Sequence, residues 1–179
     1  MIPLGDKRLK DAIKAAGLLF FGLFTAMILY PLIHELGHFV IALFVGIRVE
    51  RFALWPVPFV ECEVTAASDV EQVLIGLGGI FIPYYTSVFL KFRCFWLWYV
   101  SLLLKGISIY AMLLSFIAVV LNLNGIFWEN EDIVQVLQIF PNGAWLFLCI
   151  FGIMLAYGVH KMIGEKPLFR CCKYFGLTE

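Results

Sequence analysis

The stretch His-Glu-Leu-Gly-His at residues 34–38 lies inside one of the most apolar runs of the chain, about Ala15–Val45. On a helix, His34 and His38 are one turn apart and share a face, so both imidazoles can reach one metal ion. Glu35 lies beside that face, where a carboxylate can take a proton from a metal-bound water. Because ionisable side chains are costly in a membrane helix, the stretch predicts a zinc hydrolase that works within the membrane. The alternative is that both histidines are hydrogen-bonded structural groups in a helix bundle.

Hydrophobic residues make up 63% of the 179-residue chain, and charged residues make up only 15%. A soluble domain of this size cannot bury so much apolar surface, and a spanning helix needs about 20 apolar residues. The composition therefore predicts a mainly α-helical, multi-pass integral membrane protein in a lipid bilayer. We expect four spans, at about Ala15–Val45, at Gln72–Leu90, within Phe95–Leu121 and at Ala144–Lys161.

The third apolar run is longer than one membrane crossing and contains Lys105. Its aromatic start at residues 95–99 is typical of an interfacial belt, so we expect the crossing to begin near Lys105.

Lysine and arginine are concentrated on one side of the four spans, which predicts cytoplasmic termini. The formal net charge is zero, and no basic block indicates binding to nucleic acid. The sequence predicts neither the host membrane nor the oligomeric state.

Alternating apolar side chains follow the first span, over residues 52–55 and again over residues 60–64. Pro56 and Pro58 separate the two segments, so the pattern predicts a small membrane-associated β-hairpin with its turn at these prolines. A transmembrane substrate must unwind before its peptide bond can reach zinc, and an exposed strand edge would replace the lost hydrogen bonds. The alternative is a surface hairpin that only links two spans.

An open catalytic zinc site usually has three protein ligands and a water, so the two histidines require a third ligand. The five cysteines show no zinc-ligand spacing. The connection at residues 122–132 carries three acids and no base, which makes Glu129, Glu131 and Asp132 candidates. His160, near the end of the fourth span, is another candidate. The alternatives are a solvated acidic turn and an interfacial histidine.

The motif at residues 34–38 is followed by Phe39 and then by Gly-Ile-Arg-Val-Glu-Arg-Phe at residues 46–52. These stretches resemble the metal helix, and the segment after it, in the site-2 protease family of intramembrane zinc metalloproteases. In that family a β-hairpin or sheet follows at the membrane. The third zinc ligand of the family is an aspartate eight residues after an asparagine, and Asn124 and Asp132 have this spacing.

The resemblance implies one Zn²⁺ per chain, held by His34, His38 and Asp132. It implies that Glu35 accepts the proton of the attacking water and later passes it to the leaving amine. The substrate would then be a transmembrane segment of another protein, cleaved at a peptide bond in or near the membrane.

The chain departs from the family pattern at two places near the third ligand. Phe127 and Ile133 stand where the family usually has a proline and a glycine, and the second span lacks the family's Gly-Pro-x-x-Asn element. The resemblance covers about residues 15–135, which we take as the catalytic core of one domain over residues 1–179. Residues 136–179 add a span and a basic tail.

The family usually has its zinc nearer the cytosolic side, whereas the charge distribution of this chain indicates the reverse. A helix break at Pro31, or a re-entrant second segment, would reconcile the two. Gly78 and Gly79 are expected to permit close backbone approach in the second span. Two other classes of function stay open: an inactive family member that binds membrane helices as an adaptor or chaperone, and a metal transporter or sensor.

Overall fold

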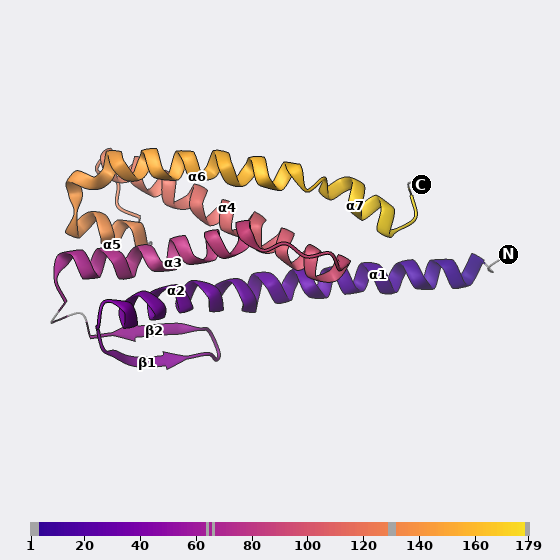
Figure 1. Ribbon diagram of the computed structural model, residues 1–179, viewed down its shortest axis with the longest axis horizontal. Coiled ribbons are helices and arrows are strands. Elements are labelled where there is room, and N and C mark those ends of the chain that lie inside the picture. Colours follow the sequence, from indigo (N-terminus) through magenta and orange to yellow (C-terminus); the bar gives the residue numbers. More distant parts are fainter. Residues whose placement is uncertain (1–3, 64, 66, 129–131, 178–179) are drawn as a thin grey trace.

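The computed structural model describes residues 4–63, 65, 67–128 and 132–177, and within these it is mainly helical, as expected. Four helical segments in this part of the chain are long and apolar enough to cross a membrane (Figure 1). They correspond to the four predicted spans, and they extend over Lys7–Phe44, Asp69–Phe89, Phe95–Leu123 and Pro141–Tyr174.

The first segment is one continuous helical rod. It consists of α1 (Leu4–Phe24), the π-helical turn η1 (Thr25–Leu29) and α2 (Tyr30–Phe44), which carries the His-Glu-Leu-Gly-His motif. A proline has no N–H to donate, and the π turn just before Pro31 accommodates it without a break. A helix break at Pro31, one of the two arrangements that would reconcile the charge bias with the family's orientation, is therefore not present. At about 1.5 Å per residue the rod is roughly 60 Å long, which exceeds a hydrocarbon core of about 30 Å.

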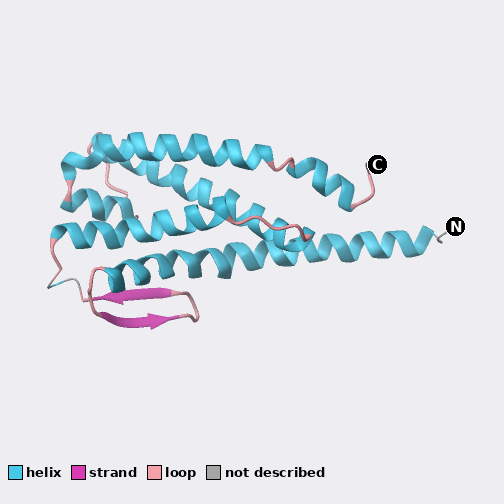
Figure 2. Ribbon diagram, viewed as in Figure 1, coloured by secondary structure: helices cyan, strands magenta, loops and turns pink. Residues whose placement is uncertain are grey.

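The predicted β-hairpin is present and is the chain's only sheet among the described residues (Figure 2). The rod ends at Phe44, and Gly46 turns the backbone with a φ of +80°. Strand β1 (Val49–Ala53) then pairs antiparallel with β2 (Phe59–Cys62). The turn contains both prolines, as expected. Strand β2 is the one that packs more closely on α2 (Figure 1).

Helix α3 (Asp69–Phe89) begins with a capping box in which Ser68 and Glu71 exchange hydrogen bonds. It crosses α2 so closely that a Cβ on Gly78 would lie 2.7 Å from the carbonyl oxygen of Gly37. A Cβ on Gly79 would meet the imidazole of His38. The expected close approach at Gly78 and Gly79 is confirmed, and it presses the α3 backbone against the histidine face of α2.

Helix α4 (Phe95–Leu123) starts at the aromatic residues and continues through Lys105, and the point within it at which the membrane crossing begins stays a prediction. Lys105 is 1% exposed and donates a hydrogen bond to the carboxylate of Glu165. Because the ammonium is neutralised inside the bundle, its charge does not require the helix to reach water at this point.

Two short helices were not predicted. Helix α5 (Asp132–Ile139) lies in the connection before the fourth span, and α7 (Pro167–Tyr174) follows α6 (Ala144–Gly164). The turn η3 (Pro141–Gly143) joins α5 to α6. Helix α5 adds buried side chains to a core shared by α3, α4 and α6; they are Ile133, Val134, Val136 and Leu137. Both chain ends lie at one end of the molecule, while the hairpin and α5 lie at the other (Figure 1).

Candidate metal centre

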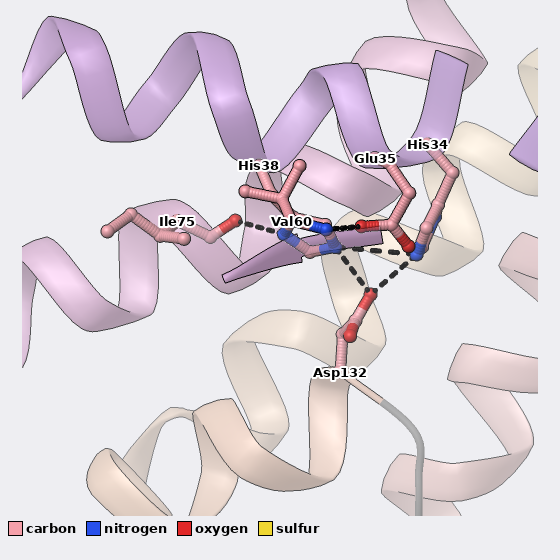
Figure 3. Close-up of polar contacts among 6 residues, drawn as sticks. All are labelled: His34, Glu35, His38, Val60, Ile75 and Asp132. Carbon is pink, nitrogen blue, oxygen red and sulfur yellow. Dashed lines mark hydrogen bonds and ion pairs between the residues drawn. The ribbon is translucent and has the colours of Figure 1, made fainter. Parts of the chain in front are cut away.

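His34, His38 and Asp132 meet at one point although they come from two elements far apart in the sequence (Figure 3). The Nε2 atoms of the two histidines are 3.4 Å apart. Asp132 Oδ2 lies 3.2 Å from His34 Nε2 and 3.4 Å from His38 Nε2. Three potential ligand atoms thus form a nearly equilateral triangle.

The size of this triangle fits a zinc ion. In a tetrahedral site with bonds of about 2.0–2.1 Å, neighbouring ligand atoms lie about 3.3–3.4 Å apart. The three observed separations, 3.2, 3.4 and 3.4 Å, match that edge length. Three protein ligands would leave the fourth position for a water or a substrate carbonyl, as in catalytic zinc sites.

The proton on His38 also fits a bound cation. His38 Nδ1 lies 2.8 Å from the carbonyl oxygen of Ile75, which can only accept a hydrogen bond. Nδ1 therefore carries a proton, and in the neutral ring Nε2 has a lone pair that a cation can bind. His38 Nε2 and the Asp132 carboxylate lie 3.4 Å apart, which suits an ion pair when the ring is protonated and a bound cation between them when it is not. The contact to Ile75 is the outer-shell hydrogen bond that usually orients a metal-binding histidine.

Asp132 is the first residue of α5, whose packing on α3 and α4 aims the carboxylate at α2. Burial alone would raise the pKa of the Asp132 carboxyl, but hydrogen bonds and charge from His34 and His38 outweigh this and lower it. The positive end of the helix dipole acts in the same direction. Asp132 is therefore ionised at neutral pH, the state that a metal ligand requires.

Glu35 lies beside the cluster rather than in it. Its Oε2 accepts a hydrogen bond of 2.9 Å from the backbone N–H of Val60 in β2 (Figure 3). It lines a cavity of about 390 Å³ together with His38 and Asp132. A carboxylate at this place can accept a proton from a water bound at the cluster. Cys62 lines the same cavity, and burial together with the Glu35 charge raises the pKa of its thiol.

A second cavity, of about 270 Å³, reaches the cluster from the other side. His34 and Asp132 line it, together with Tyr30, Met112 and Ser115. Asp132 borders both cavities, so the triangle of ligand atoms lies between them.

Replacing Gly79 with alanine is expected to disturb the cluster. The added Cβ would collide with the His38 ring and lie 3.0 Å from His34 Cε1, so α3 must move away from α2. We expect zinc affinity to fall at least about tenfold and stability to fall by about 1–3 kcal/mol, as in overpacked cores. Zinc titration and thermal unfolding in detergent measure both effects. Gly106→Ala is the matched control, because nothing lies within 4 Å of its Cβ. Equal behaviour of the two variants would contradict this account.

The remaining candidate ligands do not join the cluster in the described part of the chain. Glu129 and Glu131 lie outside the described residues. His160 is exposed on α6 and is not one of the three residues whose ligand atoms gather within 4.8 Å. Sequence reasoning missed the Ile75 carbonyl and the Val60 amide. Both are backbone groups, which carry no signal in the side-chain pattern.

Searches of protein-family models, of curated proteins and of solved structures found no match for this chain.

Proposed function

We propose that the chain is a multi-pass membrane protein and an intramembrane zinc endopeptidase. The observation that carries the proposal is the triangle formed by His34, His38 and Asp132, with Glu35 beside it, at the end of a long apolar helix. A carboxylate next to an open site with two histidines and one aspartate is the donor set for metal-assisted hydrolysis. The resemblance of residues 34–52 to site-2 proteases supports the same reaction.

Each residue of the site has a separate role in the proposed reaction. His34, His38 and Asp132 would hold the zinc. When bound, zinc lowers the pKa of its water toward neutrality and polarises the scissile carbonyl. Glu35 takes the proton of the attacking water and delivers it to the leaving amine. The Ile75 carbonyl holds the His38 ring in the tautomer that ligates through Nε2.

The substrate is proposed to be a transmembrane segment bound in extended form along β2. Phe59 and Val60 of this strand line the same cavity as Glu35. The Val60 N–H points to the carboxylate of Glu35, away from the partner strand β1. An unwound substrate needs partners for its backbone groups, and the edge of β2 that does not pair with β1 lies next to the cluster.

The test is cleavage of a fluorogenic membrane-anchored peptide by the purified full-length protein in liposomes. Removal of zinc with 1,10-phenanthroline is expected to reduce the rate at least 100-fold, and added Zn²⁺ should restore it, because one metal ion does the activation. The non-chelating isomer 1,7-phenanthroline is the control. A rate that persists without metal would refute the zinc mechanism.

The charge bias predicts the orientation of the protein. Reporter fusions after residue 179 are expected to give a cytoplasmic signal, and insertions at Val57 in the hairpin turn should give the opposite one. The reverse pair of signals would overturn this orientation and place the cluster nearer the cytosol. Signals from the same side at both positions would contradict the odd number of crossings, three, that is expected between the hairpin and the tail.

A further inference from the structure

A groove lined by basic and aromatic side chains lies at the end of the molecule opposite the metal centre. It has a volume of about 440 Å³ and is bordered by the start of α4 and by α7. Its lining includes the cations Arg93, Arg170 and Lys173 and the aromatic residues Phe95, Trp98 and Tyr174. None of these residues has a role in the proposed hydrolysis.

The walls of the groove are held by specific contacts. The rings of Phe95 and Tyr174 stack with centroids 3.7 Å apart, which joins α7 to the start of α4. The Arg170 guanidinium lies 5.1 Å from the centre of the Trp98 ring. Trp98 is 3% exposed and donates its indole N–H to Glu165 at 2.9 Å. A stacked guanidinium keeps its N–H groups, which lie in its own plane, available for an anion.

Among the residues that the structure describes, no acidic group compensates the charge of the groove. Glu165 lies just before α7, and this carboxylate is already engaged by the buried ammonium of Lys105. Within the described residues, no ion pair is formed by Arg93, Arg170 or Lys173, and no acidic side chain lines the groove. Three cations thus line one space that contains no anion from the described residues.

The depth of the groove identifies the kind of anion. It lies where α3 ends at Phe89, where α4 begins at Phe95 and just beyond the end of α6 at Gly164. The ends of apolar spanning helices lie at the level of lipid headgroups, where tryptophan and tyrosine also gather. An anion at that depth, with apolar helix surface beside it, is the phosphate of a membrane lipid.

We propose that this groove binds the headgroup of an anionic phospholipid, with the phosphate between Arg93, Arg170 and Lys173. This rests on the membrane insertion in the proposed function but not on the protease activity. Arginine binds phosphate through two parallel hydrogen bonds, which favours a fixed headgroup over diffuse attraction. The acyl chains would lie along the apolar residues of α4.

Native mass spectrometry of the full-length protein in detergent tests the proposal. The probes are palmitoyl-oleoyl phosphatidylglycerol and, for comparison, palmitoyl-oleoyl phosphatidylcholine. We expect the wild-type protein to bind one phosphatidylglycerol at least about tenfold more tightly than phosphatidylcholine. Arg170→Gln and Arg93→Gln should each weaken phosphatidylglycerol binding about tenfold, the effect of losing a charged hydrogen-bond donor. The control is Lys91→Gln, an exposed cation of the same connection that does not line the groove.

Three outcomes would overturn the proposal. Equal losses in Lys91→Gln and Arg170→Gln would show attraction to general surface charge. Equal binding of the two lipids would show that the anion is not recognised. Inorganic phosphate at millimolar concentration is tested as a competitor and, in a thermal unfolding experiment, as a ligand by itself. If it displaces the lipid and raises the unfolding temperature as much as phosphatidylglycerol does, the groove binds a soluble phosphate. Circular dichroism of each variant excludes loss of α7 as the cause. If the protein is instead soluble when cells are lysed without detergent, the proposed membrane insertion is refuted. Failure of the lipid site and failure of membrane insertion are therefore distinguishable.

Discussion

Glu35→Gln is expected to lower the rate of peptide cleavage about 10²–10⁴-fold, the usual contribution of a general base. Glutamine has nearly the same shape, and its amide oxygen can still accept the hydrogen bond from the Val60 N–H. The variant therefore keeps the local structure and removes only the group that takes the proton. Its rate in liposomes, measured beside zinc content per chain, separates the loss of the base from the loss of the metal.

Glu61→Gln is the matched control, because Glu61 is an exposed glutamate on the same strand as Val60. It should cleave at the wild-type rate. A Glu35→Gln variant that retains wild-type activity would remove this residue from the mechanism. A wild-type protein that binds a transmembrane peptide but never cleaves it, with unchanged binding by Glu35→Gln, would favour the adaptor or chaperone function instead.

The sequence alone was sufficient to predict the four apolar helices and the hairpin. Both depend on patterns that are local in the chain: long apolar runs, and alternating residues around Pro56 and Pro58. His34 and His38 share a helix face for the same reason, since their spacing alone determines it. The contact of His34 and His38 with Asp132 joins segments that are far apart in the sequence. Only the resemblance to a known family distinguished Asp132 from Glu129 and Glu131 as the third ligand.

The features that were not predicted depend on contacts between distant segments. Helix α5 is only eight residues long, too short to be stable by itself, and it forms because four of its side chains are buried against other helices. The burial of Lys105 in an ion pair was not predicted, because this lysine looked like an interfacial charge. Its partner Glu165 lies 60 residues away, so no local pattern indicates the pair.

Replacing any one of the three residues of the triangle with alanine is expected to remove most of the bound zinc. We expect His34→Ala, His38→Ala and Asp132→Ala each to weaken zinc binding more than about 100-fold, since even outer-shell partners contribute about 10–100-fold. Metal analysis of detergent-purified protein should give one zinc per wild-type chain and far less in each variant. His160→Ala is the control, because this exposed histidine lies outside the cluster.

The pattern among these variants distinguishes the possible ligand sets. Zinc that is lost in His34→Ala but retained in Asp132→Ala would transfer the third position to Glu129 or Glu131. That result would also mean that a shared metal ion does not explain the distances of 3.2 and 3.4 Å between Asp132 Oδ2 and the two Nε2 atoms. Equal loss in all three variants, with zinc retained in His160→Ala, is the result required by a triangle whose edges match a tetrahedral ion. Wild-type protein that binds no zinc would remove the basis for hydrolysis, because Glu35 would then have no activated water to deprotonate.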